Sequence, residues 1–177
     1  MTSDRAKENV VSEQEIRWEY DVVEVGQEGP PIVFDVTEEL IARYATAVRN
    51  DNPAYQPLGA RETGSRELLA MPTMITRAAP LRRGDIAANN GFVAQERAKE
   101  NPFQTPFAKC EIRWFAPVRA GDTLTSSGHI VEKYERRGNK FVTIRVEADN
   151  QRGERVAEYD YTCIFEFGKG QKKAEGE

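Results

Sequence analysis

The sequence predicts an α+β domain in which an antiparallel sheet wraps around a helix. Residues 123–167 contain three long runs of alternating apolar and polar side chains separated by short turns, which is typical of antiparallel strands. An amphipathic helix pattern follows residue 37, and a second apolar segment occupies residues 73–81. Because strands, helices and then a run of strands follow one another, the order of elements is that of an α+β domain.

Length and composition indicate one domain. The chain has 177 residues, enough for a single core. We expect the domain to span residues 15–168, with disordered polar segments at 1–14 and 169–177. The net charge of −4 gives no basic surface for nucleic acid. No apolar run approaches the ~20 residues of a membrane helix, so we expect no membrane association and a cytoplasmic location.

The first half of the chain predicts two short strands and a capped helix. Residues 16–25 alternate loosely, and residues 32–36 form a second strand pattern. Thr37 is a good N-cap, and two glutamates follow it in the first helical turn. The Asn/Asp/Pro cluster at 50–53 should end this helix.

The second half predicts a buried helix, a long connection and the main strands. Apolar residues at 73–81 favour a helix that covers the sheet. The connection at 82–106 is unusually long, so we expect a pocket lid or a subunit contact, with a helical stretch near 93–99. Strands are predicted at 108–114, 123–136, 141–148 and 155–167.

The cysteines and the histidine do not form a metal-binding pattern. Cys110 and Cys163 lie in separate strand patterns and are predicted to be buried thiols in a reducing compartment. His129 lies within a predicted strand and should face solvent or a partner. One histidine and two separated cysteines cannot supply a usual ligand set, so no metal and no other cofactor is expected.

Four segments carry a family resemblance. They are DVTEELIARYA at 35–45, NDNPAY at 50–55, MPTM at 71–74 and FAPVRAGDTL at 115–124. In this order they resemble MaoC-like hydratases/dehydratases of the hotdog fold, and more closely the branch related to the dehydratase domain of type I fatty acid synthases. The resemblance implies that the antiparallel sheet wraps around a central helix that follows Pro72. It also implies a homodimer or a heterodimer with a second hotdog subunit.

The resemblance places the chemistry at the turn after the first helix. In the family, an Asp and a His that flank Asn-Pro add water to, or remove it from, an acyl thioester of coenzyme A or a carrier protein. Here Asn50 stands at the position of the Asp and Tyr55 at that of the His, while Asp51 offers a replacement carboxylate. The catalytic candidates are therefore Asn50, Asp51 and Tyr55. The candidate substrate-binding residues are Asn52, Pro53, Pro72, Thr73 and Met74.

These replacements leave two main hypotheses about the function open. An Asn cannot act as a base, and Tyr with an ordinary pKa of about 10 is a poor one. One reading is a substrate-shaping subunit whose partner retains the Asp/His pair. The other is an active hydratase with a rewired site built on Asp51 and Tyr55. A non-enzymatic acyl-CoA-binding or thioesterase-like hotdog is a further alternative, although residues 73–81 lack the carboxylate that such thioesterases often use.

Some of these residues also have a purely structural interpretation. Asn and Asp residues routinely end helices and form Asx-turns, and Tyr55 could simply pack. Arg113 and Arg119 are candidates for the phosphates of coenzyme A, although exposed arginines seldom have so specific a role.

Overall fold

The computed structural model describes residues 15–57 and 68–168. The two predicted disordered ends, at 1–14 and 169–177, lie outside the described residues. Residues 58–67 also lie outside them.

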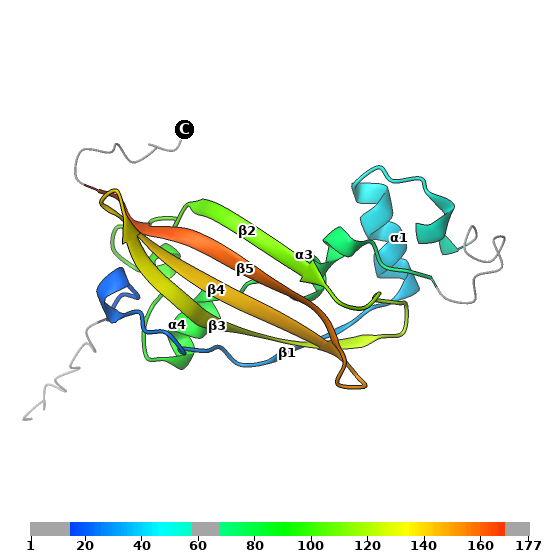
Figure 1. Ribbon diagram of the computed structural model, residues 1–177, viewed down its shortest axis with the longest axis horizontal. Coiled ribbons are helices and arrows are strands. Elements are labelled where there is room, and N and C mark those ends of the chain that lie inside the picture. The colour runs from blue at the N-terminus through cyan, green and yellow to red at the C-terminus, as the bar shows by residue number, and fades with distance from the viewer. Residues whose placement is uncertain (1–14, 58–67, 169–177) are drawn as a thin grey trace, which may run out of the picture.

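A five-stranded antiparallel sheet forms the body of the molecule (Figure 1), in the order β1-β3-β4-β5-β2. Strands β3, β4 and β5 form the predicted meander, and β2 pairs with the far side of β5. The strands predicted at 32–36, 108–114, 123–136, 141–148 and 155–167 are therefore confirmed, apart from small shifts at their ends. Their bounds are β1 Ile32–Asp35, β2 Phe107–Trp114, β3 Thr123–Arg136, β4 Asn139–Asn150 and β5 Arg155–Glu166.

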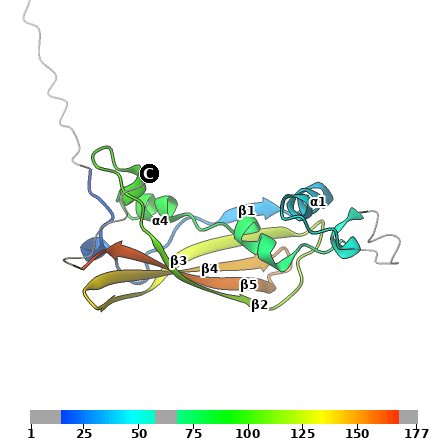
Figure 2. The ribbon, with the colours of Figure 1, turned by 90° about the horizontal axis from the view of Figure 1, so that it is seen from above.

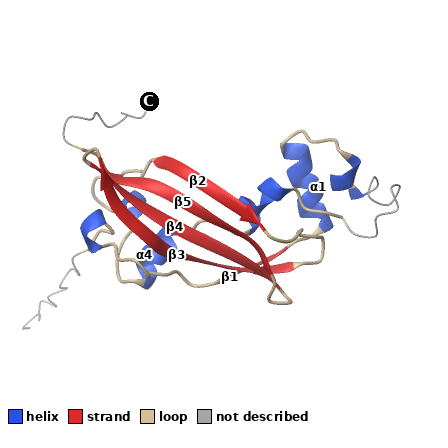
Figure 3. Ribbon diagram, viewed as in Figure 1, coloured by secondary structure: helices blue, strands red, loops and turns tan. Residues whose placement is uncertain are grey.

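The helices lie on one face of this sheet (Figure 2), and Figure 3 distinguishes them in blue from the red strands. They are α1 (Glu38–Ala47), α3 (Ile75–Ala78) and α4 (Arg83–Asn89). The Thr37 hydroxyl accepts a hydrogen bond from the Leu40 amide, so the predicted cap of α1 is confirmed. A sheet with one helical face and one open face agrees with the expected hotdog arrangement.

The helix expected at 73–81 is interrupted, and this corrects its predicted extent. A 3-10 helix, Pro72–Met74, leads into α3, which ends at Ala78. Pro80 has no amide hydrogen and disfavours a helical conformation at Ala79, so the helix cannot continue. The buried Tyr159 hydroxyl donates to the Ala79 carbonyl at 2.6 Å, which satisfies a carbonyl that the break would leave free.

The inner face of the sheet carries two hydrophobic clusters. The first packs under α1 and α3 and includes Ile41, Ile75 and Tyr159. The second packs under α4 and includes Trp18 and Phe165, whose rings meet edge to face at 5.5 Å between centroids. The interruption of the helical layer thus separates two cores on one sheet.

The segment at 16–25 is not a strand, contrary to the sequence prediction. It forms a short 3-10 helix, Tyr20–Val22, and Arg17 makes only an isolated bridge with Val93. Trp18 is 1% exposed and its indole donates to the Gln27 side chain at 2.9 Å. The apolar residues of this segment therefore cover the second core instead of extending the sheet.

The long connection at 82–106 packs over the same second core. It contains α4 and a further 3-10 helix, Gln95–Arg97. Arg83 and Glu96 form a largely buried ion pair at 3.1 Å, and Arg83 also lies 3.4 Å from the Cys163 sulfur. This pair joins the two helical pieces above the sheet.

The cysteines are free thiols. Cys163 is buried as predicted, and burial raises its pKa, whereas Cys110 is only partly buried. Among the described helices, none has the length and apolar character that a membrane span requires.

The open face of the sheet carries paired charges. Arg145 on β4 donates two hydrogen bonds to Asp160 on β5, at 2.7 and 2.8 Å. The hydrogen bond from Arg145 lowers the pKa of Asp160. Arg113 on β2 pairs with Glu158 at 2.7 Å, so this arginine is engaged within the sheet.

We expect Tyr159→Phe to lower the free energy of unfolding by about 1–2 kcal/mol, because the Ala79 carbonyl would lose its buried donor. Tyr161→Phe is the matched control, since Tyr161 lies on the same strand and none of its described contacts is a hydroxyl hydrogen bond. Urea unfolding measures both variants. Equal effects of the two substitutions would contradict the role assigned to the Tyr159 hydroxyl.

The Arg145–Asp160 pair should make stability depend on pH. Because the folded-state pKa of Asp160 is lowered, its contribution is present above the unfolded value of about 3.9. It is lost as the pH falls through the lower, folded value. We expect Asp160→Asn to lose less stability than wild type between about pH 6 and about pH 3 in urea unfolding. Exposed Glu132→Gln should behave like wild type, and an unchanged pH dependence in Asp160→Asn would refute the assignment.

Candidate functional site

An apolar cavity of about 300 Å³ lies between α3 and the end of β2. It opens at one end of the sheet, next to the turn that follows α1. Its lining comes from α3 with the turn before it, from the 3-10 helix after α1, and from the end of β2 with the segment that follows it. Val36, which precedes α1, also contributes. The lining residues are Val36, Tyr55, Leu69, Ala70, Met71, Pro72, Met74, Ile75, Ala78, Trp114, Phe115, Ala116, Pro117 and Val118.

Helix α3 and the turn before it form one wall. Met71, Met74, Ile75 and Ala78 recur at the spacing of one helical face, so one side of the segment lines the cavity. Exposure is lower at the helical end of this wall: Pro72 is exposed, whereas Met74, Ile75 and Ala78 are 2%, 4% and 3% exposed. The cavity therefore has an open mouth near Pro72 and a closed floor near Ala78.

The end of β2 forms the opposite wall at the mouth. Trp114 and Phe115 both line the cavity, and both remain about half exposed, at 49% and 56%. The Trp114 indole donates to the Pro72 carbonyl at 3.1 Å. This hydrogen bond joins the strand end to the turn that begins the helical wall.

The FAPVRAGDTL segment builds the structure beside the cavity. Asp122 is 4% exposed and accepts from the Arg119 amide at 2.8 Å and from the Gln151 side chain at 3.1 Å. Gly121 has φ +89°, a left-handed conformation that an L side chain rarely adopts. Together they fix the tight turn that aims Pro117 and Val118 at the cavity.

The turn after α1 is held by its own asparagines. The Asn50 side-chain oxygen accepts from the Asn52 amide at 3.0 Å, and the Asn52 side chain accepts from the Ala54 amide at 3.0 Å. These are Asx-type contacts that end a helix and begin the 3-10 helix Pro53–Tyr55. The Asn50 amide group also lies 3.6 Å from the Met71 sulfur, which connects the turn to the cavity wall.

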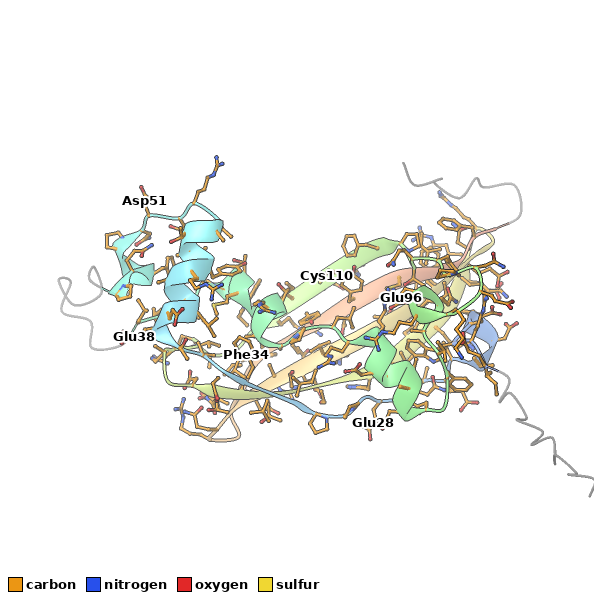
Figure 4. The ribbon with its side chains drawn as sticks, turned by 180° about the vertical axis from the view of Figure 1, so that it is seen from behind. Glu28, Phe34, Glu38, Asp51, Glu96 and Cys110 are labelled. Carbon is orange, nitrogen blue, oxygen red and sulfur yellow. The ribbon has the colours of Figure 1, made fainter. Side chains whose placement is uncertain are left out.

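The three catalytic candidates occupy different surroundings. Tyr55 is half-buried and lines the cavity. Asn50 contacts the sulfur of the lining residue Met71, but it does not itself line the cavity. Asp51 is exposed, and Figure 4 shows it on the outer edge of the turn. Their catalytic roles stay predictions, but the described structure brings only Tyr55 to the cavity.

The candidate substrate-binding residues divide in the same way. Pro72 and Met74 line the cavity, whereas Asn52, Pro53 and Thr73 are exposed and do not.

Two residues considered from sequence lie on the open face of the sheet. His129 is opposite Arg145 in the β3–β4 register, and cross-strand partners share a face. Arg113 pairs with Glu158 on the same face. Neither residue lines the cavity.

The lid expected at 82–106 does not cover this cavity. Of the described residues, none from that segment contributes to its lining. The segment instead covers the second core at the other end of the sheet, where Figure 4 shows Glu96.

Several lining residues could not be assigned to a site from sequence. Val36 and Ala78 have ordinary apolar patterns, and only the packed structure distinguishes a cavity wall from a filled core. Trp114 and Phe115 are recognisable in the sequence, because two adjacent large aromatic residues where a strand ends cannot both enter the core under the sheet.

The lining defines what the cavity can do chemically. Its described residues include no carboxylate, imidazole or amine, and Tyr55 supplies the single ionisable side chain. Across the described part of the chain, no group of three or more His, Cys, Asp or Glu residues is arranged to hold a metal ion. The cavity is thus suited to binding an apolar group and poorly equipped to move protons.

Comparison with known families gives one extended match. The model of the FAS1-like dehydratase domain region matches residues 24–159. A UPF0336 protein of Saccharopolyspora erythraea is 25% identical over 142 residues, which cover 79% of this chain and 87% of that protein.

Solved structures share the fold. The HadBC (3R-hydroxyacyl-ACP dehydratase) complex of Mycobacterium tuberculosis matches with TM-score 0.63 and 26% identity, covering 80% of this chain and 98% of the matched chain. A MaoC-like dehydratase of Rhodospirillum rubrum matches with TM-score 0.58 and 19% identity, covering 86% and 99%. The hotdog fold expected from the sequence is therefore confirmed.

Proposed function

The chain belongs to the FAS1-like dehydratase domain region family, and on this premise we propose that it is the acyl-chain-binding subunit of a heteromeric hydratase/dehydratase. The substrates would be 2,3-enoyl and 3-hydroxyacyl thioesters. The observation that carries the proposal is an apolar cavity whose described lining offers one tyrosine and no other ionisable side chain.

The cavity suits the apolar part of such a substrate. A volume of about 300 Å³ lies at the lower end of the range for small-molecule pockets, and an engineered apolar cavity of about 150 Å³ already binds benzene. The charged nucleotide of coenzyme A has no counterpart in this lining. The acyl tail would therefore enter the cavity while the thioester and its carrier stay at the mouth.

The chemistry requires groups that this cavity lacks. Hydration of a 2,3-double bond needs a base that activates water and an acid that delivers a proton. Asn50 cannot fill either role, and its side-chain oxygen is already engaged in the turn. Asp51 is exposed on the outer edge of the turn (Figure 4) and does not line the cavity. We assign the acid/base pair to a second hotdog subunit, and the similarity to a chain of the HadBC complex supports that arrangement.

The edge of the sheet offers a place for such a partner. Strand β2 pairs with β5 on one side, and no described strand pairs with its other side. An unpaired strand edge is ready to accept another chain. Phe107, Trp114 and Phe115 are large apolar residues exposed along or next to this edge. Because Trp114 and Phe115 also line the cavity, a partner there would complete its mouth.

One observation favours a second candidate function. Tyr55 occupies the family position of the catalytic His and does line the cavity. A single-chain hydratase would use Tyr55 with Asp51, and would need the turn to move so that Asp51 reaches the mouth.

We expect the purified chain to hydrate enoyl-CoA thioesters negligibly, because its cavity lacks an acid/base pair. Loss of the enoyl absorbance measures the reaction. Co-expression with a hotdog protein that retains the Asp/His pair should give a complex that is active. Rapid turnover by the chain alone, abolished in Asp51→Asn or Tyr55→Phe, would instead establish the single-chain hydratase.

The affinity for an acyl-CoA should rise with the length of its acyl chain until the chain reaches the floor of the cavity. The lining from Met71 to Ala78 extends about 10 Å along the segment. For saturated acyl-CoAs, calorimetry should show affinity rising about fourfold per added methylene and then levelling off. Ala78→Leu should make it level off at a shorter chain. Affinity that does not depend on chain length would show that the tail binds elsewhere.

A further inference from the structure

Trp114 connects the two walls of the cavity. It is the last residue of β2, and its indole nitrogen donates to the Pro72 carbonyl at 3.1 Å. The same carbonyl accepts the Ile75 amide in the first turn of the helical wall. One carbonyl thus receives two donors, one from the strand wall and one from the helical wall. This arrangement fixes the separation of the two walls at the mouth.

The exposure of Trp114 argues against a purely structural role. Trp18, the other tryptophan of the chain, is 1% exposed and fills the second core. Trp114 leaves 49% of its surface exposed while its ring lines the cavity. A half-exposed aromatic ring beside an apolar cavity leaves a flat apolar surface against which a bound ligand can pack.

We propose that Trp114 is a positioning residue of the acyl cavity. Its hydrogen bond to Pro72 holds the mouth at a fixed width, and its ring packs against the carbons of the acyl chain nearest the thioester. This inference rests on the proposed function, because it takes the occupant to be an acyl chain. It adds that Trp114 positions every acyl chain at the mouth of the cavity, whatever the length of the acyl chain.

A role at the mouth gives a characteristic dependence on chain length. Carbons near the thioester pass Trp114 in every substrate, whereas only longer chains reach the floor at Ala78. Loss of the Trp114 ring should therefore lower the affinity for all acyl chains by a similar factor. The gain per added methylene should remain as in wild type.

The experiment measures binding of saturated acyl-CoAs of increasing length by calorimetry, since these thioesters cannot be hydrated. We expect Trp114→Ala to weaken binding about tenfold at every length. Trp114→Phe keeps a ring but loses the hydrogen bond, so a loss of about fivefold is expected. Phe107→Ala is the matched control: Phe107 is 57% exposed at the other end of β2 and does not line the cavity.

Fluorescence provides a second measurement that does not depend on the alanine variant folding. Covering the half-exposed Trp114 ring should shift the tryptophan emission of the wild-type chain to shorter wavelength. In Trp114→Phe only buried Trp18 remains, so the shift should disappear. Unfolding midpoints of all variants separate loss of binding from loss of stability.

The outcomes separate this inference from the proposed function. If the wild-type chain binds acyl-CoAs but Trp114→Ala and Trp114→Phe bind like Phe107→Ala, the positioning role is wrong and the acyl-binding function stands. A loss that grows with chain length would also overturn it, because that pattern belongs to the floor. If the wild-type chain binds no acyl-CoA, the proposed function and this inference fall together.

Discussion

Helix α3 ends over the sheet at Ala78, and the Tyr159 hydroxyl donates to the carbonyl of the next residue, Ala79. A helical layer with a break at Pro80 cannot satisfy its last carbonyls within the helix. Strand β5 supplies the missing donor, so the break is held in a defined place. The short helix then covers one core and borders the cavity, while α4 covers a second core. The division of the molecule into a cavity end and a packed end follows from this interruption.

The residues that carry the family resemblance have structural roles in this chain. Asn50 and Asn52 close the turn after α1 through their own backbone contacts. Asp122 holds the turn beside the cavity and is buried in doing so. These contacts preserve the shape of the site without requiring an acid or a base in it. A subunit that binds the acyl chain and leaves proton transfer to its partner needs that shape alone.

Sequence patterns predicted the sheet well and the helical layer less well. Alternation along β3, β4 and β5 reflects a two-residue period that a half-buried strand must have. The cap at Thr37 was equally readable, because it depends on local chemistry. The segment at 16–25 and the extent of α3 depended on tertiary packing, on Trp18 entering a core and on Pro80 ending a helix. Tyr55, Pro72 and Met74 of the cavity lining were indicated by the family resemblance. The other lining residues could not be predicted, because a wall and a core have the same apolar pattern.

Whether an acyl chain occupies the cavity is tested most directly by locating the end of a bound chain. A saturated acyl-CoA with a photoreactive diazirine on its terminal carbon can be irradiated with the protein, and the labelled peptides identified by mass spectrometry. The label is expected at the cavity floor, on Ile75 or Ala78, and it should be lost when an unmodified acyl-CoA competes. Labelling on the open face of the sheet or on the second core, with the floor unlabelled, would contradict binding in the cavity.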